Sequence, residues 1–306
     1  MAPVIGIVGN GIVGRRAAET LAALGMDTHI THPRNATQLS TCDAVVVATG
    51  EPQVMLVSAF AAQGVPVVST SDNLADVLAI TDLHDLAVRN SAPVVAGAAC
   101  SPGMSGLLVR HMARAFESID EVHTAVHGTG GPMCARNHHE ALAGVSVGWH
   151  DGEWLQRPAG SGRELCWFPD PVGARDCYRF ASSEPVLMQR LAPGLQRISA
   201  RVSATRRDRL TARLPMLRRP HAEGLEGALR VEVRGVRNGK RHVEIVGVVD
   251  KVGTVAGVVA AHTAHALART SVPGGVHNLG QEALPNADIL DAVTASQIEL
   301  HQFVGF

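Results

Sequence analysis

The sequence predicts an α/β protein in which a Rossmann-type parallel-sheet domain is followed by a second, α+β domain with a mainly antiparallel sheet. An apolar run ends at a glycine-rich turn near the N-terminus, and strand and helix patterns then alternate. From Ile119 onward, polar and apolar residues alternate within strands instead. The 306 residues are sufficient for two domains. We expect the first domain over 1–118, the second over 119–271, and a C-terminal helix, at about 272–306, that packs back on the first.

The composition is that of an ordinary globular protein. Hydrophobic residues make up 46% and charged residues 18% of the chain, and the formal net charge is -1. This charge offers no general attraction to nucleic acid or to anionic membranes. We find no signal peptide and no apolar run long enough to span a bilayer. The five cysteines contain no CxxC pair, which favours reduced thiols, so we expect a cytoplasmic protein.

A glycine-rich turn follows the first predicted strand, residues 4–8. It consists of Gly9, Asn10, Gly11, Ile12, Val13 and Gly14, and a predicted helix begins within it. In this G-x-G-x-x-G spacing the first glycine permits a tight turn, the second lets the backbone approach a pyrophosphate, and the third lets the helix pack against the strand. The free N–H groups at a helix N-terminus favour negative charge. We therefore expect these residues to bind a dinucleotide, with a glycine-rich turn that binds nothing as the alternative.

The end of the second predicted strand, residues 27–32, bears on the choice of nicotinamide cofactor. An acidic residue about 20 positions beyond the glycines would bind the ribose 2′-hydroxyl of NAD, but the sequence at this place is His32-Pro33-Arg34-Asn35. An arginine here can bind the 2′-phosphate of NADP. We therefore expect NADP. The alternatives are NAD as the cofactor and Arg34 as a solvated loop residue.

Three further predicted strands, 43–50, 65–70 and 93–97, alternate with helices predicted over 52–63 and 73–90. These strands are continuous apolar runs, which is typical of a parallel sheet covered on both faces. Ligands of such sheets bind outside the carboxyl ends of the strands. We therefore expect five residues at these ends to contact the cofactor, namely Ala48, Thr49, Gly50, Ser69 and Thr70.

A small-residue loop, 98–106, follows the last of these strands and ends in Pro102-Gly103 before a helix. Together with the turn 9–14 and the ladder 67–72, this loop resembles the saccharopine dehydrogenase-like (saccharopine reductase-like) family over roughly the first 120 residues. The resemblance implies an NAD(P)-dependent oxidoreductase that acts on an imine or another double bond. We expect Pro102 and Gly103 to contact the substrate. The chain is shorter than most family members, and residues 71–73 lack an aromatic residue that the family often has there. We therefore expect this chain to share the family's type of reaction but not its substrate.

The second domain is predicted to begin with a half-exposed strand over 119–127. Further short strands are expected around 165–168 and 196–205. The clearest hairpin joins strands at 228–234 and 241–249 through Asn238-Gly239, because Asn-Gly between alternating strands is a strong hairpin signal. An apolar, small-residue helix over 253–269 is expected to cover this sheet, with His262 and His265 as core or interface residues.

The densest polar cluster outside the glycine-rich turn lies over residues 127–140. Glycines beside a strand end, followed by Arg136, His138 and His139, are typical of a binding loop that leads into a helix. Histidine titrates near neutral pH, so we expect His138 or His139, or else His127, to act as the acid or base. Arg136 can hold a substrate carboxylate through two hydrogen bonds. A structural role for each histidine is the alternative.

The cysteines suggest two further kinds of site. Cys100 is a candidate nucleophile, but no group that would activate it can be assigned, and its alternative role is a small residue lining the nicotinamide pocket. A metal site built from Cys134, His138, His139 and Glu140 matches no common zinc spacing. We therefore expect no metal.

These patterns predict an NADP-dependent oxidoreductase that transfers a hydride between nicotinamide and an imine or carbonyl of a small, amino-acid-like substrate, bound in a cleft between the domains. The alternatives are an enoyl- or sugar-type reductase on the same cofactor domain and a dinucleotide-binding protein without catalysis. A basic run over 203–219 is either a solvated helix face or a site for an anionic substrate or a partner subunit. It lacks interleaved aromatic residues, so we expect no nucleic acid as a partner. We also expect no membrane partner, and a homodimer formed through the second domain's sheet.

Overall fold

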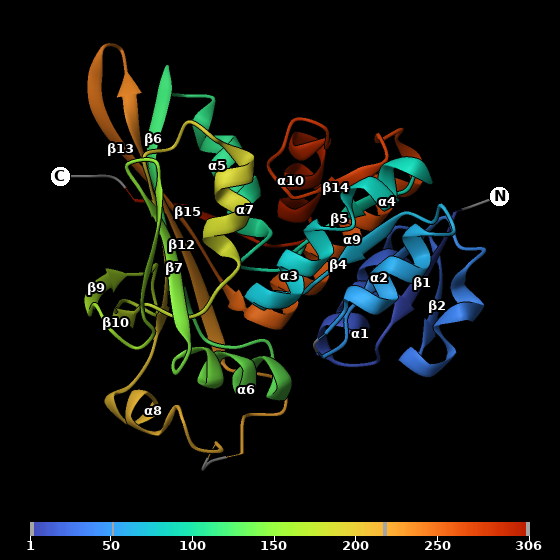
Figure 1. Ribbon diagram of the computed structural model, residues 1–306, viewed down its shortest axis with the longest axis horizontal. Coiled ribbons are helices and arrows are strands. Elements are labelled where there is room, and N and C mark those ends of the chain that lie inside the picture. Colours follow the sequence, from blue (N-terminus) through green and yellow to red (C-terminus); the bar gives the residue numbers. More distant parts are fainter. Residues whose placement is uncertain (1–2, 51, 217–218, 304–306) are drawn as a thin grey trace. The chain divides into compact units, whose positions relative to one another are not determined.

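The computed structural model describes residues 3–50, 52–216 and 219–303, which form two compact units. The parallel-sheet unit is made from Met1–Met104 and Gly253–Gln297. The mixed-sheet unit is made from Ser105–Val252 and Ile298–Phe306. Figure 1 shows the elements of both. No helix in the described ranges is both long and apolar enough to cross a membrane.

The parallel-sheet unit alternates strands and helices along the chain, as the apolar runs predict (Figure 1). Its strands are β1 (Val4–Val8), β2 (Asp27–Thr31), β3 (Ala44–Val47), β4 (Val67–Ser69), β5 (Pro93–Val95) and β14 (Gly275–His277). Its helices are α1 (Ile12–Ala23), the 3-10 helix η1 (Pro33–Leu39), α2 (Val54–Ala61), α3 (Leu74–Thr81), α4 (His84–Arg89), α9 (Val252–Arg269, in this unit from Gly253) and α10 (Asn286–Ala295).

The six strands are all parallel and lie in the order β14-β5-β4-β3-β1-β2. The chain runs outward from β1 to β2 and then returns to β3 on the other side of β1. Such a reversal leaves a crevice outside the carboxyl ends of the two strands that flank it. The residues that follow β1 and β3 are therefore at the place where ligands of this kind of sheet bind, and the Rossmann-type fold expected for this region is confirmed.

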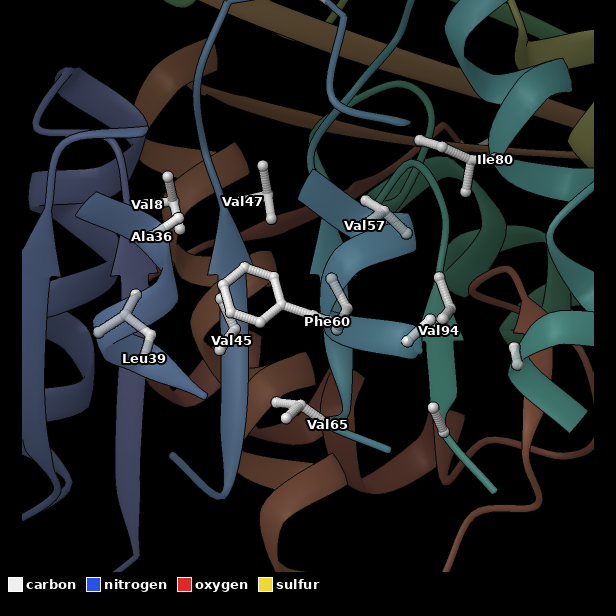
Figure 2. Close-up of a cluster of buried hydrophobic side chains, with 14 of the residues drawn as sticks. Val8, Ala36, Leu39, Val45, Val47, Val57, Phe60, Val65, Ile80 and Val94 are labelled. Carbon is white, nitrogen blue, oxygen red and sulfur yellow. The ribbon is translucent and has the colours of Figure 1, made fainter. Parts of the chain in front are cut away.

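One face of the parallel sheet is covered by η1, α2, α3 and α4 (Figure 2). Val45 and Val47 of β3 are fully buried there, and Phe60 of α2 lies over this strand. Most of the cluster is Val, Ala and Leu. Because these side chains are short or branched, helices and sheet approach closely and fill the space without large aromatic rings.

Helix α9 belongs to the parallel-sheet unit, whereas the sequence predicts that it covers the second sheet. It is buried on almost every side, and a helix that is apolar all round has no stripe to show which sheet it covers. It lies against α1, because a Cβ added to Gly257 would be 2.6 Å from Arg16 Cβ and 2.9 Å from the Val13 carbonyl oxygen. The compact units divide the chain after Met104, after Val252 and after Gln297.

The C-terminal helix is shorter than the sequence predicts. Helix α10 ends at Ala295, and Gln297 has a φ of 68°, in the left-handed region that ends helices. Residues Leu300–Gln302 then form strand β15, which pairs with β13 in the other sheet. The last part of the expected helix, residues 304–306, lies outside the described ranges.

The mixed-sheet unit contains a nine-stranded sheet with short helices. Its strands are β6 (Ser118–His127), β7 (Val145–His150), β8 (Glu153–Pro158), β9 (Glu164–Trp167), β10 (Ala174–Tyr178), β11 (Arg197–Ser203), β12 (Glu226–Arg237), β13 (Lys240–Lys251) and β15. Its helices are α5 (Met104–Ala113, in this unit from Ser105), α6 (Pro132–Ala141), α7 (Glu184–Leu191) and α8 (Arg206–Thr211).

The order in this sheet is β15-β13-β12-β6-β11-β10-β9, with β7 pairing with β11 and β8. Only β6 and β11 are parallel among the described pairs, so the expected mainly antiparallel sheet is confirmed. The predicted hairpin is β12 and β13, joined by Asn238 and Gly239 at φ values of 52° and 68°. Two successive left-handed residues match the right-handed twist of the flanking strands.

The two faces of the mixed sheet differ in polarity. Val122 of β6, Val202 of β11 and Val233 of β12 point to one face, and all three are buried. Glu121 and Glu232 alternate with these valines and point to the other face. We call this second face the charged face, because it also carries Arg197, Arg201, Arg230 and Arg234.

Candidate functional site

The turn after β1 has the geometry that its glycine spacing predicts. Gly9 has a φ of 115°, and a Cβ there would lie 2.3 Å from the Ala48 carbonyl oxygen. A Cβ on Gly14 would lie 2.0 Å from the Gly9 carbonyl oxygen, so α1 packs on the turn only because this residue has no side chain. A Cβ on Gly11, by contrast, would meet no described atom within 4 Å. The chain itself therefore needs two of the three glycines, and the third faces open space.

Helix α1 begins beside this open glycine. Gly11 is its N-cap residue, no side chain caps it, and its first turn contains no acidic residue. Asn10 and Gly11 are exposed, and Ile12 and Val13 are half-buried. The N–H groups of a first helical turn carry partial positive charge. This end of α1 can therefore hold a phosphate-bearing group.

The buried side chain of Gln53 ties together the ends of β3 and β4. Its Nε2 donates to the Thr49 carbonyl oxygen at 3.0 Å, and its Oε1 accepts from Ser69 Oγ at 2.8 Å. Thr70 Oγ1 lies 3.4 Å from Gln53 Nε2 and donates to the Val47 carbonyl oxygen at 3.1 Å. The hydroxyls of Ser69 and Thr70, two of the residues expected to contact the cofactor, thus help to fix this edge of the sheet. Ala48 and Thr49 are half-buried, and Gly50 is exposed.

Asp76 holds Gln53 in place. Its carboxylate accepts hydrogen bonds from the backbone N–H of Gln53 at 3.0 and 2.9 Å and from that of Val54 at 3.0 Å. It thereby caps α2 from a position in α3. Sequence reasoning missed Gln53 and Asp76, because a cap supplied from another helix leaves no local pattern beside the helix that it caps.

Arg34 lies in η1, shortly after the end of β2, and its side chain is exposed. Its backbone N–H donates to His32 Nδ1 at 3.3 Å. The Gly9 N–H donates to the Thr31 carbonyl oxygen at 2.9 Å, which ties the end of β2 to the glycine turn. Within the described ranges no carboxylate pairs with the Arg34 guanidinium, so its charge is available to a ligand at this edge.

The loop after β5 is closed by its own backbone. Gly103 has a φ of 124°, and a Cβ there would lie 2.3 Å from both the N and the O of Ala99. The Ala99 N–H donates to the Pro102 carbonyl oxygen at 3.0 Å. Pro102 and Gly103 are buried, and Cys100 is 3% exposed. The Pro-Gly pair is therefore explained by loop geometry, and its expected contact with substrate stays a prediction.

The mixed-sheet unit contains a cavity of about 650 Å³ at the ends of β6 and β11. Three expected site residues line it, namely His127, His138 and His139. Arg175, Asp208 and Ser203 add a cationic, an acidic and a hydroxyl side chain. Arg136, the fourth expected residue of this region, is exposed on α6 and does not line the cavity.

His127 ends β6, and its Nδ1 lies 2.6 Å from Ser203 Oγ. The Nε2 atom has no hydrogen-bonding partner in the described part of the chain. Burial, and then the charge of Arg175, lower the pKa of His127 below its usual value of 6.5. The imidazole is therefore neutral at neutral pH, is held by Ser203, and offers one nitrogen to the cavity.

His139 and His138 occupy different surroundings on α6. His139 Nε2 lies 3.0 Å from the Thr211 carbonyl oxygen and 3.1 Å from that of Leu214, so it donates to the turn after α8. His138 Nε2 lies 3.8 Å from Cys134 Sγ. Because His139 is directed to backbone carbonyls, the four-residue metal site weighed from the sequence does not assemble around it.

Sequence reasoning missed Arg175 and Ser203. Strand β11 runs parallel to β6 with Val202 beside Val126, so Ser203 follows next to His127. Both strands were predicted, but the sequence did not predict that they pair with each other. Arg175 reaches the cavity from β10, and no local pattern links it to the histidines.

No protein-family model and no curated protein matches the sequence. Solved structures do match the fold. Saccharopine dehydrogenase (L-Glu forming) from Saccharomyces cerevisiae has a TM-score of 0.71 at 13% identity, over 99% of this chain and 100% of that chain. C. glutamicum DAP dehydrogenase in complex with DAP has a TM-score of 0.55 at 14% identity, over 96% and 98%. An engineered D-amino acid dehydrogenase bound to NADP+ has a TM-score of 0.52 at 13% identity, over 96% and 99%. The fold implied by the resemblance is thus confirmed.

Proposed function

We propose that this chain, which shares the fold of saccharopine dehydrogenase, is an oxidoreductase of that kind that binds a nicotinamide dinucleotide at the turn between β1 and α1. The observation that carries this proposal is the contrast among the three glycines. Gly9 and Gly14 are required by the chain's own packing, whereas Gly11 faces open space next to an uncapped helix N-terminus. A ligand phosphate at that place explains why a third glycine is present.

We infer that the preferred cofactor is NADP. Arg34 follows β2, is exposed, and pairs with no carboxylate in the described part of the chain. A guanidinium suits a phosphate because it offers paired hydrogen bonds as well as charge. The engineered D-amino acid dehydrogenase of the same fold binds NADP+.

This preference is tested by fluorescence titration of the purified protein with NADPH and with NADH. Arg34→Ser should weaken NADPH binding by about tenfold or more and leave NADH binding nearly unchanged, because only NADPH has the 2′-phosphate. Equal losses for the two cofactors would show that Arg34 does not select between them.

We propose that the substrate is a small amine or amino acid bound in the mixed-sheet cavity. All three of the matched structures described above are of dehydrogenases named after amino acids or their derivatives. The cavity offers the cation of Arg175 for a carboxylate and the neutral imidazole of His127 for a proton. When bound, the nicotinamide accepts or supplies the hydride. His127 Nε2 would take the proton that the amine loses on oxidation, and would return it in the reverse direction.

The expected catalytic residues have different roles in the proposed reaction. We assign the proton to His127, a positioning role to His139 on the turn after α8, and a place in the cavity wall to His138. Arg175 replaces the exposed Arg136 as the group that holds a carboxylate. Cys100 is assigned a packing role in its closed loop.

The histidines of β6 offer a matched pair of variants. His123 Nδ1 lies 2.8 Å from Ser199 Oγ, much as His127 Nδ1 lies 2.6 Å from Ser203 Oγ, but His123 does not line the substrate cavity. His127→Asn should lower turnover by about 100-fold with NADPH affinity retained, whereas His123→Asn should leave turnover nearly unchanged. Turnover is measured by NADP(H) absorbance with a panel of amines and amino acids, and with oxo acids plus ammonia. Binding of NADPH without turnover on any of them would favour a non-catalytic protein.

A further inference from the structure

A second cavity, of about 500 Å³, opens on the charged face of the mixed sheet. It lies among β7, β8 and β11, and it shares no lining residue with the proposed substrate cavity. Five of its lining residues are arginines, namely Arg157, Arg179, Arg197, Arg201 and Arg234, whereas only two are acidic, Glu164 and Glu232. The proposed function gives this cavity no role.

The carboxylates near this cavity are already paired. Glu232 is buried between Arg230 and Arg234, with N···O distances of 2.5 Å to each. Glu121 lies 3.8 Å from Arg197 and 3.4 Å from Arg234. These ion pairs therefore offer little unsatisfied charge to a ligand.

Arg157 and Arg179 are left without a carboxylate. In the described ranges neither forms an ion pair, and the Arg157 guanidinium donates only to the Gln156 carbonyl oxygen, at 3.0 Å. Glu164, which also lines the cavity, pairs with Arg201 at 2.5 Å. The cavity therefore contains an excess of positive charge carried by two arginines of neighbouring segments.

The absence of a side chain at Gly162 leaves space for the Arg179 guanidinium. Gly162 has a φ of 62°, and a Cβ on it would lie 1.8 Å from Arg179 Nη1, so any larger residue would displace the guanidinium. Burial lowers the pKa of Arg179, and the charges of Arg201 and Arg157 lower it further. Like charges held together in this way repel each other unless an anion joins them.

We propose that this cavity is a binding site for a small anion that carries at least two phosphate or carboxylate groups, held by Arg157 and Arg179. Guanidinium groups bind both kinds of oxyanion through paired hydrogen bonds, and two of them set apart in one cavity suit a ligand with two such groups. Trp149 lines the same cavity, with its Nε1 fixed on the Leu195 carbonyl oxygen at 2.7 Å. It supplies a rigid wall and a spectroscopic probe.

The test is a titration of tryptophan fluorescence and of melting temperature with pyrophosphate and, separately, with citrate, at constant ionic strength set by sodium chloride. It is performed in the Gly11→Ala background, because the proposed dinucleotide site also attracts phosphate. Saturable binding is expected. Arg157→Gln and Arg179→Gln should each weaken it by about tenfold or more. Arg114→Gln, an exposed arginine just after α5 that does not line the cavity, should have no effect.

Tighter binding of pyrophosphate identifies a phosphorylated ligand, and tighter binding of citrate identifies a polycarboxylate; either result supports the site. A response that does not saturate, or one that Arg114→Gln weakens equally, overturns the proposal. The mass of the protein in solution is measured in parallel by light scattering. If Arg157→Gln and Arg179→Gln change the association state while neither anion binds, the two arginines face a second copy of the chain, and the proposal is wrong.

Discussion

The candidate sites of the two units consist of different groups: backbone in the parallel-sheet unit and side chains in the mixed-sheet unit. In the parallel-sheet unit the site is mostly backbone: two glycines pack the turn, a third leaves it open, and helix N–H groups supply the partial charge. In the mixed-sheet unit the sites are side chains from several strands, such as His127 on β6 and Arg175 on β10. A backbone site leaves a contiguous pattern in the sequence, whereas a side-chain site depends on which strands become neighbours.

The same contrast holds for the interiors. The inner strands β3, β4 and β5 of the parallel sheet are buried on both faces, and β3 is Ala and Val throughout. The mixed sheet has a charged face on which Glu232 is nearly buried with two arginines around it. Substitutions that disturb packing should therefore cost the most stability in the parallel-sheet unit, and substitutions that remove a charge should cost the most in the mixed-sheet unit.

The largest effect is expected for Gly14→Val. The new Cβ would lie 2.0 Å from the Gly9 carbonyl oxygen, which belongs to the backbone and cannot turn aside. Overpacking of this kind costs about 3 kcal/mol or more of unfolding free energy. Urea unfolding followed by circular dichroism measures it. A loss within about 0.5 kcal/mol would show that α1 can move away from the turn at little cost.

Next in size is Glu232→Gln in the mixed-sheet unit. Burial alone would raise the pKa of Glu232, but hydrogen bonds and charges from Arg230 and then Arg234 bring it below its usual value. The carboxylate is therefore ionised. Its removal leaves Arg230 without a carboxylate partner in the described part of the chain, and leaves Arg234 with only the longer contact to Glu121, at 3.4 Å. We expect a loss of about 2–3 kcal/mol in the same unfolding measurement. A smaller loss at low salt than at high salt would contradict this account, because screening should reduce the repulsion.

A third effect depends on pH and concerns His262 of α9. Its Nε2 lies 2.8 Å from Ser296 Oγ, and burial, followed by the charge of His265, lowers the pKa of His262 to about 4. The folded state therefore resists protonation, and stability should fall as the pH drops from about 6.5 toward 4, by on the order of 2–3 kcal/mol.

His262→Gln should flatten that part of the pH profile, because glutamine does not titrate. The exposed His221 of the mixed-sheet unit provides the matched control, His221→Gln, which should retain the profile. An unchanged slope in His262→Gln would assign the acid sensitivity to other groups.

The sequence predicted the glycine turn and the first five strands of the parallel sheet, because each depends on neighbouring residues. It missed β14 (Gly275–His277), which lies where the C-terminal helix was expected. It also predicted the β12–β13 hairpin, since Asn238-Gly239 determines that turn locally. It failed for α9, whose apolar surface fits either sheet, and for β15, where a left-handed Gln297 ends the helix early. Gln53, Asp76 and Arg175 were missed because only the fold brings them to their sites.

The central claim is that Gly11 is open because a dinucleotide binds there, and it is tested by the nucleotide affinity of Gly11→Ala. The matched control is Gly194→Ala, since a Cβ at either position meets no described atom within 4 Å. We expect both variants to keep the melting temperature of the parent, and only Gly11→Ala to lose NADPH affinity, by about 30-fold or more. Equal NADPH affinity in the two variants, with both folded, would contradict the proposed site.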